Sequence, residues 1–362
     1  MPTLYGRSHG AGDLMARVGR LEQLGGITPL EFGGGRARGV RGFAVRTGSG
    51  FEFTVVADRA LDVCSAEYRG TPLVWHGPAG VAAPSYYQPR GEDFARNFFG
   101  GLFTTCGLGN FGPPGKDRWG SFGMHGRINH LPAEHLSHRC EWRDDVCTLE
   151  ITGTMREAQM FGEDLRLDRR LRTELGSSRL LVRDRVTNDG GRSEPHMLLY
   201  HCNAGFPLLD DDLRLVVAQT AMHARDDVAE RAIDVWDRGG PPDPAFAEQV
   251  FIHQPRACAD GRAGALFVNR ARNDGRGLAL SIRFDPMQLP AIFSWRMLGV
   301  KTYVMAVEPA NCPTIEGRVA AGERGTLPML EPGETRTYEL EFEVLDDPAE
   351  IDARAALLST NR

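Results

Sequence analysis

The chain has 362 residues, of which 41% are hydrophobic and 25% charged, a composition typical of a globular protein with a sizeable core. Its formal net charge is −6 and acidic residues are interleaved with the arginines, so we expect no nucleic acid partner. The N-terminus lacks an apolar signal-peptide core, and no run of about 18 apolar residues occurs. We therefore expect a cytoplasmic protein that makes no membrane contact.

Cysteine and glycine patterns argue against cofactors. Seven cysteines are scattered along the chain without a CxxC pair or a Cys/His cluster of zinc-site spacing. Reduced thiols are therefore expected rather than a disulfide framework. The glycine-rich stretch 32–39 lacks the order of a nucleotide-binding loop, and strand-like sequence follows it. We expect neither a metal nor an organic cofactor.

The predicted elements are mostly short strands. A helix is expected at 11–24, a hairpin turn at 188–191, one or two helical turns at 245–251, and a closing helix at 348–358 that Asp347 caps. Polar and apolar residues alternate, or β-type residues gather, at 42–47, 51–56, 146–152, 180–187, 277–284 and 335–344. Many strands, few helices and no strand–helix rhythm predict an all-β, antiparallel sandwich or barrel.

Polar and aromatic residues gather in four segments that are otherwise apolar and bear glycines. No GxSxG elbow and no HExxH spacing occurs in them. These segments are 56–63 with 75–77, 97–110 with 125–129, 196–203, and 295–296 with 303–311 and 316–318. They offer acid/base groups, further His and Arg side chains for hydroxyl groups, and aromatic rings able to stack on a sugar.

Two residues stand out within these segments. In a strand over 196–203, His201 shares one face with Met197, Leu199 and Asn203. It is either a site residue or a core histidine bound to a backbone carbonyl. Glu308 follows an apolar run and precedes a proline that we expect to end the strand. Burial there raises the pKa of a carboxyl toward that of a general base, and the alternative is an ion pair with Arg296 or Arg318.

Four motifs together resemble a bacterial branch of the aldose 1-epimerase family. The motifs are Phe99–Leu108, His125-Gly-Arg127, Tyr200–Pro207 and Glu308-Pro309, and the resemblance spans residues 30–345 in the family's order. It implies a galactose mutarotase-like β-supersandwich of antiparallel sheets with few short helices. The implied organisation is an N-terminal extension, partly helical and packed on the domain (1–29), the sandwich domain (30–346) and a C-terminal helix or tail (347–362).

The resemblance also implies residue roles. His201 matches the family's general acid on the ring oxygen, and Glu308 matches its general base on the anomeric hydroxyl. His125 matches an earlier substrate-binding histidine. The stretch Tyr200–Asn203 departs from the family's Asn-His-x-Tyr-Phe-Asn pattern. Further candidates for substrate binding are Arg127, Arg59, Asp62, Asn203, Trp295, Arg296 and Arg318.

The sequence thus predicts a carbohydrate-active isomerase that interconverts the anomers of a free sugar or sugar derivative, as a monomer or homodimer. One alternative is a carbohydrate-binding or sensing protein of the same fold without turnover. Another is a lyase or hydrolase acting on an unusual sugar or sugar acid. Arginines 59, 127, 296 and 318 would suit a carboxylated or phosphorylated substrate, or they form surface ion pairs.

Overall fold

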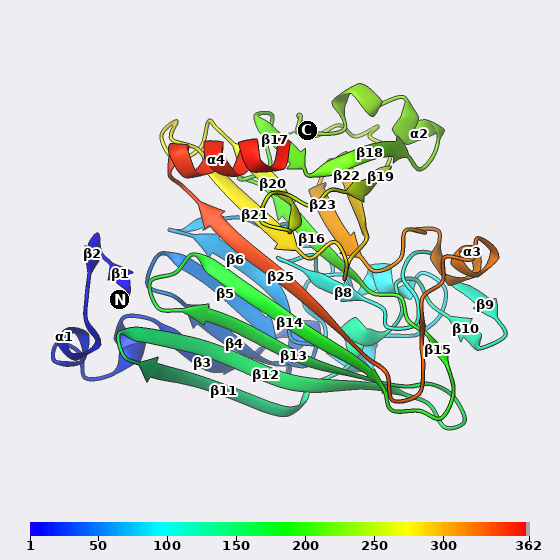
Figure 1. Ribbon diagram of the computed structural model, residues 1–362, viewed down its shortest axis with the longest axis horizontal. Helices are drawn as coiled ribbons and strands as arrows, with labels where there is room; N and C mark the ends of the chain where they lie inside the picture. The colour runs from blue at the N-terminus through cyan, green and yellow to red at the C-terminus, as the bar shows by residue number, and fades with distance from the viewer. Residues whose placement is uncertain (360–362) are drawn as a thin grey trace.

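The computed structural model describes residues 1–359 and consists mainly of three antiparallel sheets (Figure 1). The largest has eight strands in the order β11 (Glu134–Arg143), β12 (Val146–Ala158), β13 (Asp164–Glu174), β14 (Arg179–Asn188), β25 (Thr335–Leu345), β21 (Leu278–Phe284), β20 (Ala263–Asn269) and β17 (Leu213–Val217). Behind it in Figure 1 lies a five-stranded sheet of β3 (Gly26–Glu31), β4 (Arg41–Arg46), β5 (Phe51–Val56), β6 (Asp62–Tyr68) and β7 (Thr71–Pro72).

The third sheet has six strands and carries the site described below. Its order is β18 (Gln219–Ala224), β19 (Gln249–Pro255), β22 (Ala291–Gly299), β23 (Thr302–Ala310), β16 (Leu199–Gly205) and β8 (Thr104–Cys106). Three small strand pairs complete the β-structure: β1 (Thr3–Leu4) with β2 (Arg7–Ser8), β9 (Gly115–Asp117) with β10 (Gly120–Phe122), and β15 (Glu194–Pro195) with β24 (Met329–Leu330).

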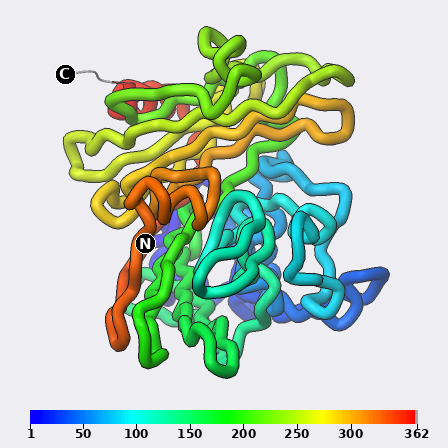
Figure 2. Tube along the Cα trace, turned by 90° about the vertical axis from the view of Figure 1, so that its right-hand side faces the viewer, coloured from blue at the N-terminus to red at the C-terminus, as the bar shows by residue number. Residues whose placement is uncertain are grey.

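Helices are few and short. The α-helices are α1 (Ala11–Met15), α2 (Asp227–Glu230), α3 (Gly317–Glu323) and α4 (Pro348–Ser359). The 3₁₀ turns are η1 (Leu21–Gln23), η2 (Gly35–Ala37), η3 (Pro84–Tyr86), η4 (Asp93–Arg96), η5 (Ile128–His130) and η6 (Ile233–Val235). Figure 2 shows the β9–β10 hairpin beside α3 on one side of the molecule. The prediction of an all-β, antiparallel architecture is confirmed.

The core lies between the sheets because their strands alternate as the sequence predicted. In β14, Leu180, Val182 and Val186 are buried, whereas Arg183 and Arg185 are exposed. The rings of Phe103 and Phe342 stack across the layers at 5.5 Å. Burying one such apolar side chain contributes roughly 1.5–3 kcal/mol, so this pattern holds the layers face to face.

A fully buried arginine connects all three sheets. Arg169 of β13 contacts Asp62 of β6 at 2.7 Å and Asp184 of β14 at 2.6 Å. It also donates a hydrogen bond to Thr105 of β8 at 2.9 Å. Tyr200 of β16 donates to the same Asp184 carboxylate at 2.7 Å. Each of these buried charged groups therefore has ion-pair or hydrogen-bond partners, which a buried ion requires.

Several local predictions differ from the structure. The expected helix at 11–24 is limited to α1 and the η1 turn, and the five-stranded sheet begins at Gly26, inside the expected extension. Residues 249–251 belong to β19 rather than to a helical turn. The turn at 188–191 connects β14 to β15, which pair with other strands, so it makes no hairpin. The closing helix is present and Asp347 accepts hydrogen bonds from the amides of Ala349 and Glu350, while residues 360–362 of the expected tail lie outside the described residues.

Pro309 does not end its strand, contrary to expectation. Strand β23 continues to Ala310, and Pro309 pairs in register with Ile292 of β22. A proline removes only its own N–H from the ladder, and strands on both sides of β23 hold the chain extended. The site residue next to it, Glu308, is thereby kept inside a regular strand.

Candidate active site

Two neighbouring strands bring His201 and Glu308 together. The register of β16 with β23 pairs Leu199 with Ala310 and Cys202 with Val307, which places His201 directly opposite Glu308. His201 Nε2 lies 3.3 Å from Glu308 Oε1. The two residues are only 6% and 4% exposed. Neither Arg296 nor Arg318 pairs with this carboxyl, because both bind elsewhere.

Burial determines the protonation of this pair. Desolvation lowers the pKa of His201 to about 3, and the nearby His125 adds to the effect. Desolvation also raises the pKa of Glu308 to about 8, with the negative charge of Glu248 as a further cause. At neutral pH both shifts favour a protonated carboxyl on Glu308 beside a neutral imidazole on His201.

A cavity of about 390 Å³ opens over the pair. This volume lies within the range of small-molecule sites, about 300–1,000 Å³. His125 lines it as well, and its ring centre lies 6.1 Å from that of His201. The backbone N–H of Gly112 donates to His125 Nδ1 at 3.3 Å, so Nε2 carries the ring proton. Burial lowers the pKa of His125 to about 4, which keeps this ring neutral.

A charged network surrounds Trp295, which also lines the cavity. The Trp295 indole Nε1 donates to Glu248 Oε1 at 2.8 Å, and its ring meets that of His201 edge-on at 5.3 Å. Arg225 contacts Glu248 at 3.0 Å and Asp226 at 2.8 Å. The network fixes the indole beside the acid/base pair.

Sequence reasoning did not find Arg225 and Glu248. Arg225 follows β18, and Glu248 directly precedes β19. Glu248 lay in a segment for which helical turns were expected, and no local motif marks either residue. Pairing of β18 with β19 brings them together, which only the folded chain shows.

Four predicted site residues share this cavity, namely His201, Glu308, His125 and Trp295. Three other predicted residues lie elsewhere, with structural contacts. Arg59 is fully buried and donates to the backbone carbonyls of residues 82, 97 and 129. Asp62 belongs to the buried Arg169 network. Asn203 donates through Nδ2 to the carbonyl of His201 at 2.7 Å and to that of Gly101 at 3.2 Å.

The remaining predicted arginines also lie away from the acid/base pair. Arg296 donates to the carbonyl of Val235 and lies over the Phe246 ring. Arg318 binds both carboxylate oxygens of Asp117, at 2.7 and 2.9 Å. Arg127 lies 4.0 Å from Glu163 and, with Arg318, lines a separate cavity of about 240 Å³. An arginine side chain is long and binds an acceptor that the fold brings near. The position of each arginine in the sequence therefore did not reveal its hydrogen-bond partner.

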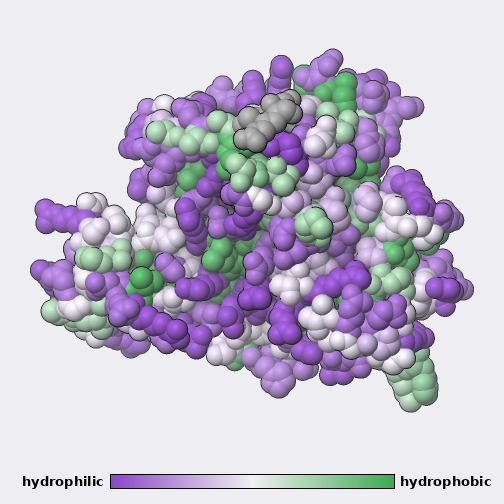
Figure 3. Space-filling model, viewed as in Figure 1, coloured by the Kyte–Doolittle hydropathy of each residue, from purple (hydrophilic) through white to green (hydrophobic). Residues whose placement is uncertain are grey.

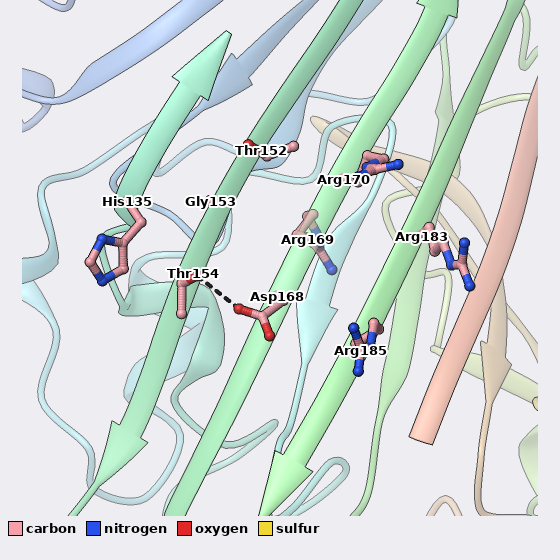
Figure 4. Close-up of a pocket in the computed structure, with 9 residues that line it drawn as sticks. All are labelled: His135, Thr152, Gly153, Thr154, Asp168, Arg169, Arg170, Arg183 and Arg185. Carbon is pink, nitrogen blue, oxygen red and sulfur yellow. Dashed lines mark hydrogen bonds between the residues drawn. The ribbon is translucent and has the colours of Figure 1, made fainter. Parts of the chain in front are cut away.

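The outer face of the eight-stranded sheet carries a groove of about 430 Å³, on a surface that Figure 3 shows as mainly hydrophilic. Figure 4 shows Arg170, Arg183 and Arg185 along β13 and β14. Arg170 lies 3.4 Å from Glu150, and Arg183 lies 3.2 Å from Glu339. Because these charges are largely paired and neither His201 nor Glu308 lines this groove, it is not the candidate active site.

All seven cysteines are free thiols, and six of them are buried. In residues 1–359 no group of three His, Cys, Asp or Glu side chains is arranged to hold a metal ion. The helices of that part of the chain are too short or too polar to cross a membrane.

Comparison with known proteins identifies the family. A family model described as a domain of unknown function, DUF4432, matches residues 37–344, whereas no curated protein matches. A candidate aldose 1-epimerase from Klebsiella pneumoniae subsp. pneumoniae MGH 78578 is 23% identical, with a TM-score of 0.85 over 92% of this chain and 88% of that chain.

More distant structures share the fold. A galactose mutarotase-like protein from Clostridium acetobutylicum has 13% identity and a TM-score of 0.58 over 90% of this chain and 99% of its own. A galactose 1-epimerase from Lactobacillus acidophilus NCFM has 14% identity and a TM-score of 0.56 over 89% and 99%, respectively. The chain belongs to the DUF4432 family, and its fold is the galactose mutarotase-like β-sandwich predicted from the sequence.

Proposed function

We propose that this protein interconverts the anomers of a free sugar, with His201 and Glu308 as its acid/base pair. The observation that carries the proposal is the contact between these residues in one cavity of small-molecule size, where burial lowers the pKa of His201 and raises that of Glu308. Two similar structures have names that agree with this reaction. The Klebsiella protein is described as a candidate aldose 1-epimerase, and the Lactobacillus protein as a galactose 1-epimerase.

The contact suits the chemistry of an anomeric centre. The ring oxygen and the anomeric hydroxyl oxygen are bonded to the same carbon, so two groups 3.3 Å apart can address both. The member that acts as base takes the proton of the anomeric hydroxyl. The member that acts as acid, Glu308 in the free protein, gives its proton to the ring oxygen. The bond between the carbon and the ring oxygen breaks, leaving an open-chain aldehyde. Rotation about the bond to the next carbon and the reverse transfers close the ring as the other anomer.

The pair is restored in every cycle because it gives one proton and takes one. The family resemblance assigns the acid role to His201, whereas burial in the free protein places the proton on Glu308. One transfer across the 3.3 Å contact interconverts the two arrangements without changing the net charge. No other group is needed for the proton balance.

The test is proton-exchange NMR of anomer interconversion on a panel of free aldoses, deoxysugars and uronic acids. We expect acceleration of at least one sugar, and a loss of roughly 10²–10⁴-fold in both Glu308→Gln and His201→Asn. Matched control variants are Glu339→Gln and His135→Asn, both on the exposed outer face of the eight-stranded sheet, and these should retain the wild-type rate.

One outcome would contradict the proposal. If the wild-type protein binds sugars, as seen by saturation-transfer NMR, but accelerates none of them, it is a carbohydrate-binding or sensing protein on this fold. Acceleration that survives both active-site substitutions would assign the chemistry to other residues.

A further inference from the structure

The cavity over His201 and Glu308 offers unusually few polar groups for a sugar. Its polar lining consists of the acid/base pair, His125, Arg225 and Glu248. Trp295 contributes its ring, since its Nε1 is bound to Glu248. The remaining side chains of the lining are mostly apolar, and the largest are Phe94, Phe98, Met124, Val250 and Ile315.

The charges of the lining do not favour an anionic sugar. Arg225 is the single cation among the charged lining residues, and it is engaged by Glu248 at 3.0 Å and by Asp226 at 2.8 Å. A carboxylate or phosphate on the sugar would compete with these two acids and lie near the Glu308 carboxyl. A bidentate contact with Arg225, which such groups prefer, would have to displace one of these two acids.

Neutral hydroxyl groups also find few partners. The acid/base pair addresses the ring oxygen and the anomeric hydroxyl. The other polar side chains of the lining are His125, whose protonated Nε2 is a donor, and Arg225 and Glu248, which bind one another. Any other hydroxyl directed at Phe94, Met124 or Ile315 would lose its water without gaining a partner, which costs roughly tenfold in affinity. A methyl or methylene group at the same position would instead gain contact with these side chains.

We infer that the substrate is a neutral deoxysugar, in which an apolar substituent replaces at least one hydroxyl or hydroxymethyl group of a common hexose. The inference rests on the proposed function, because it takes His201 and Glu308 to lie at the anomeric centre. The Trp295 ring covers an apolar face of the sugar, and its orientation is held by the hydrogen bond to Glu248.

The experiment compares matched sugars that differ in one group: L-fucose with L-galactose, L-rhamnose with L-mannose, and 6-deoxy-D-glucose with D-glucose. D-galacturonic acid serves as the anionic probe. For each sugar both the dissociation constant and kcat/KM for anomer exchange are measured by NMR. We expect at least one deoxysugar to exceed its parent hexose roughly tenfold in both quantities, and the uronic acid to bind weakest.

The two readouts separate this inference from the proposed function. If parent hexoses or the uronic acid bind as tightly as every deoxysugar, the inference is overturned, whatever the turnover. If deoxysugars bind preferentially but no sugar is accelerated, the ligand class stands and the proposed isomerase activity fails.

Substitutions in the cavity lining test whether its apolar side chains cause the preference for deoxysugars. Met124→Gln keeps the side-chain length and adds an amide that can bind a hydroxyl, so the preference for the deoxysugar should shrink. Val250→Thr makes a nearly isosteric polar change at a second position. Met287→Gln, at a residue 88% exposed, is the matched control and should leave the preference unchanged. An undiminished preference in both lining variants, folded as judged by thermal unfolding, would contradict the inference.

Discussion

His201 on β16 and Glu308 on β23 face one another across an antiparallel strand pair, with 3.3 Å between Nε2 and Oε1. Burial disfavours the charged form of both groups, the imidazolium and the carboxylate. It therefore lowers the pKa of His201 and raises the pKa of Glu308. At neutral pH this favours a protonated Glu308 beside a neutral His201. This contact, its neighbour Glu248 and the buried Arg169 network lead to four predictions that can be tested by experiment.

The first concerns the pH dependence of anomer exchange. Since the pKa of Glu308 is about 8, raising the pH through that value removes the carboxyl proton that the free protein offers as a general acid. We expect kcat/KM to fall with a single-proton limb near pH 8, because this quantity reports the free protein. The measurement is a pH profile between 6 and 10 with a sugar that is accelerated. A rate independent of pH over this range would place the proton elsewhere.

The second concerns stability. The carboxyl of Glu308 has a folded-state pKa above its unfolded value, so the folded state holds a proton that the unfolded state releases between about pH 4.5 and 8. Stability from this group is present at low pH and is lost as pH rises, by about 1.4 kcal/mol per pH unit at most.

Glu308→Gln removes this titration. We expect the variant to match the wild type near pH 5 and to exceed it by a few kcal/mol at pH 8. Urea unfolding at the two pH values checks the sign. A variant that is equally destabilised at both would indicate lost packing rather than a removed carboxylate.

The third prediction concerns the arginine that connects the sheets. Arg169→Met leaves Asp62 and Asp184 buried without their cation, which we expect to cost about 3–5 kcal/mol. Burial already raises the pKa of Asp62, so protonation should reduce the loss at pH 5 relative to pH 8.

The control is Arg183→Met on the exposed side of the adjacent strand, visible in Figure 4. Its partner Glu339 is 51% exposed, so the change should cost no more than about 1 kcal/mol. Thermal unfolding of both variants decides between the two roles. Equal losses would mean that the buried network is dispensable.

The fourth prediction concerns Glu248, whose negative charge helps to raise the pKa of Glu308. Glu248→Gln keeps an acceptor for the Trp295 indole but removes this charge, so the carboxylate of Glu308 becomes easier to form. We expect the alkaline limb of the rate profile to move to lower pH. Because Glu248 is 51% exposed, the shift should be larger at low ionic strength. An unmoved limb would show that desolvation alone sets this pKa.

Alternation along single strands was readable from the sequence. The run at 180–187 predicted a strand with one buried face, and in β14 Leu180 and Val182 face inward while Arg183 faces away from the core. Alternation also placed His201 and Asn203 on one face, and the apolar run before Glu308 predicted a buried carboxyl. Each of these properties depends on a few consecutive residues, because a strand repeats every two residues.

The partners of those residues were decided by the tertiary structure. His201 meets Glu308 only because β16 and β23 pair in one register, and Arg225 meets Glu248 because β18 pairs with β19. The same packing buries Asp62 and Arg59 in the interior. There Asp62 forms an ion pair with Arg169, and Arg59 donates hydrogen bonds to backbone carbonyls. A sequence determines which faces of its strands are apolar, but the pairing of distant strands determines which polar groups meet, since that pairing maximises burial over the whole chain.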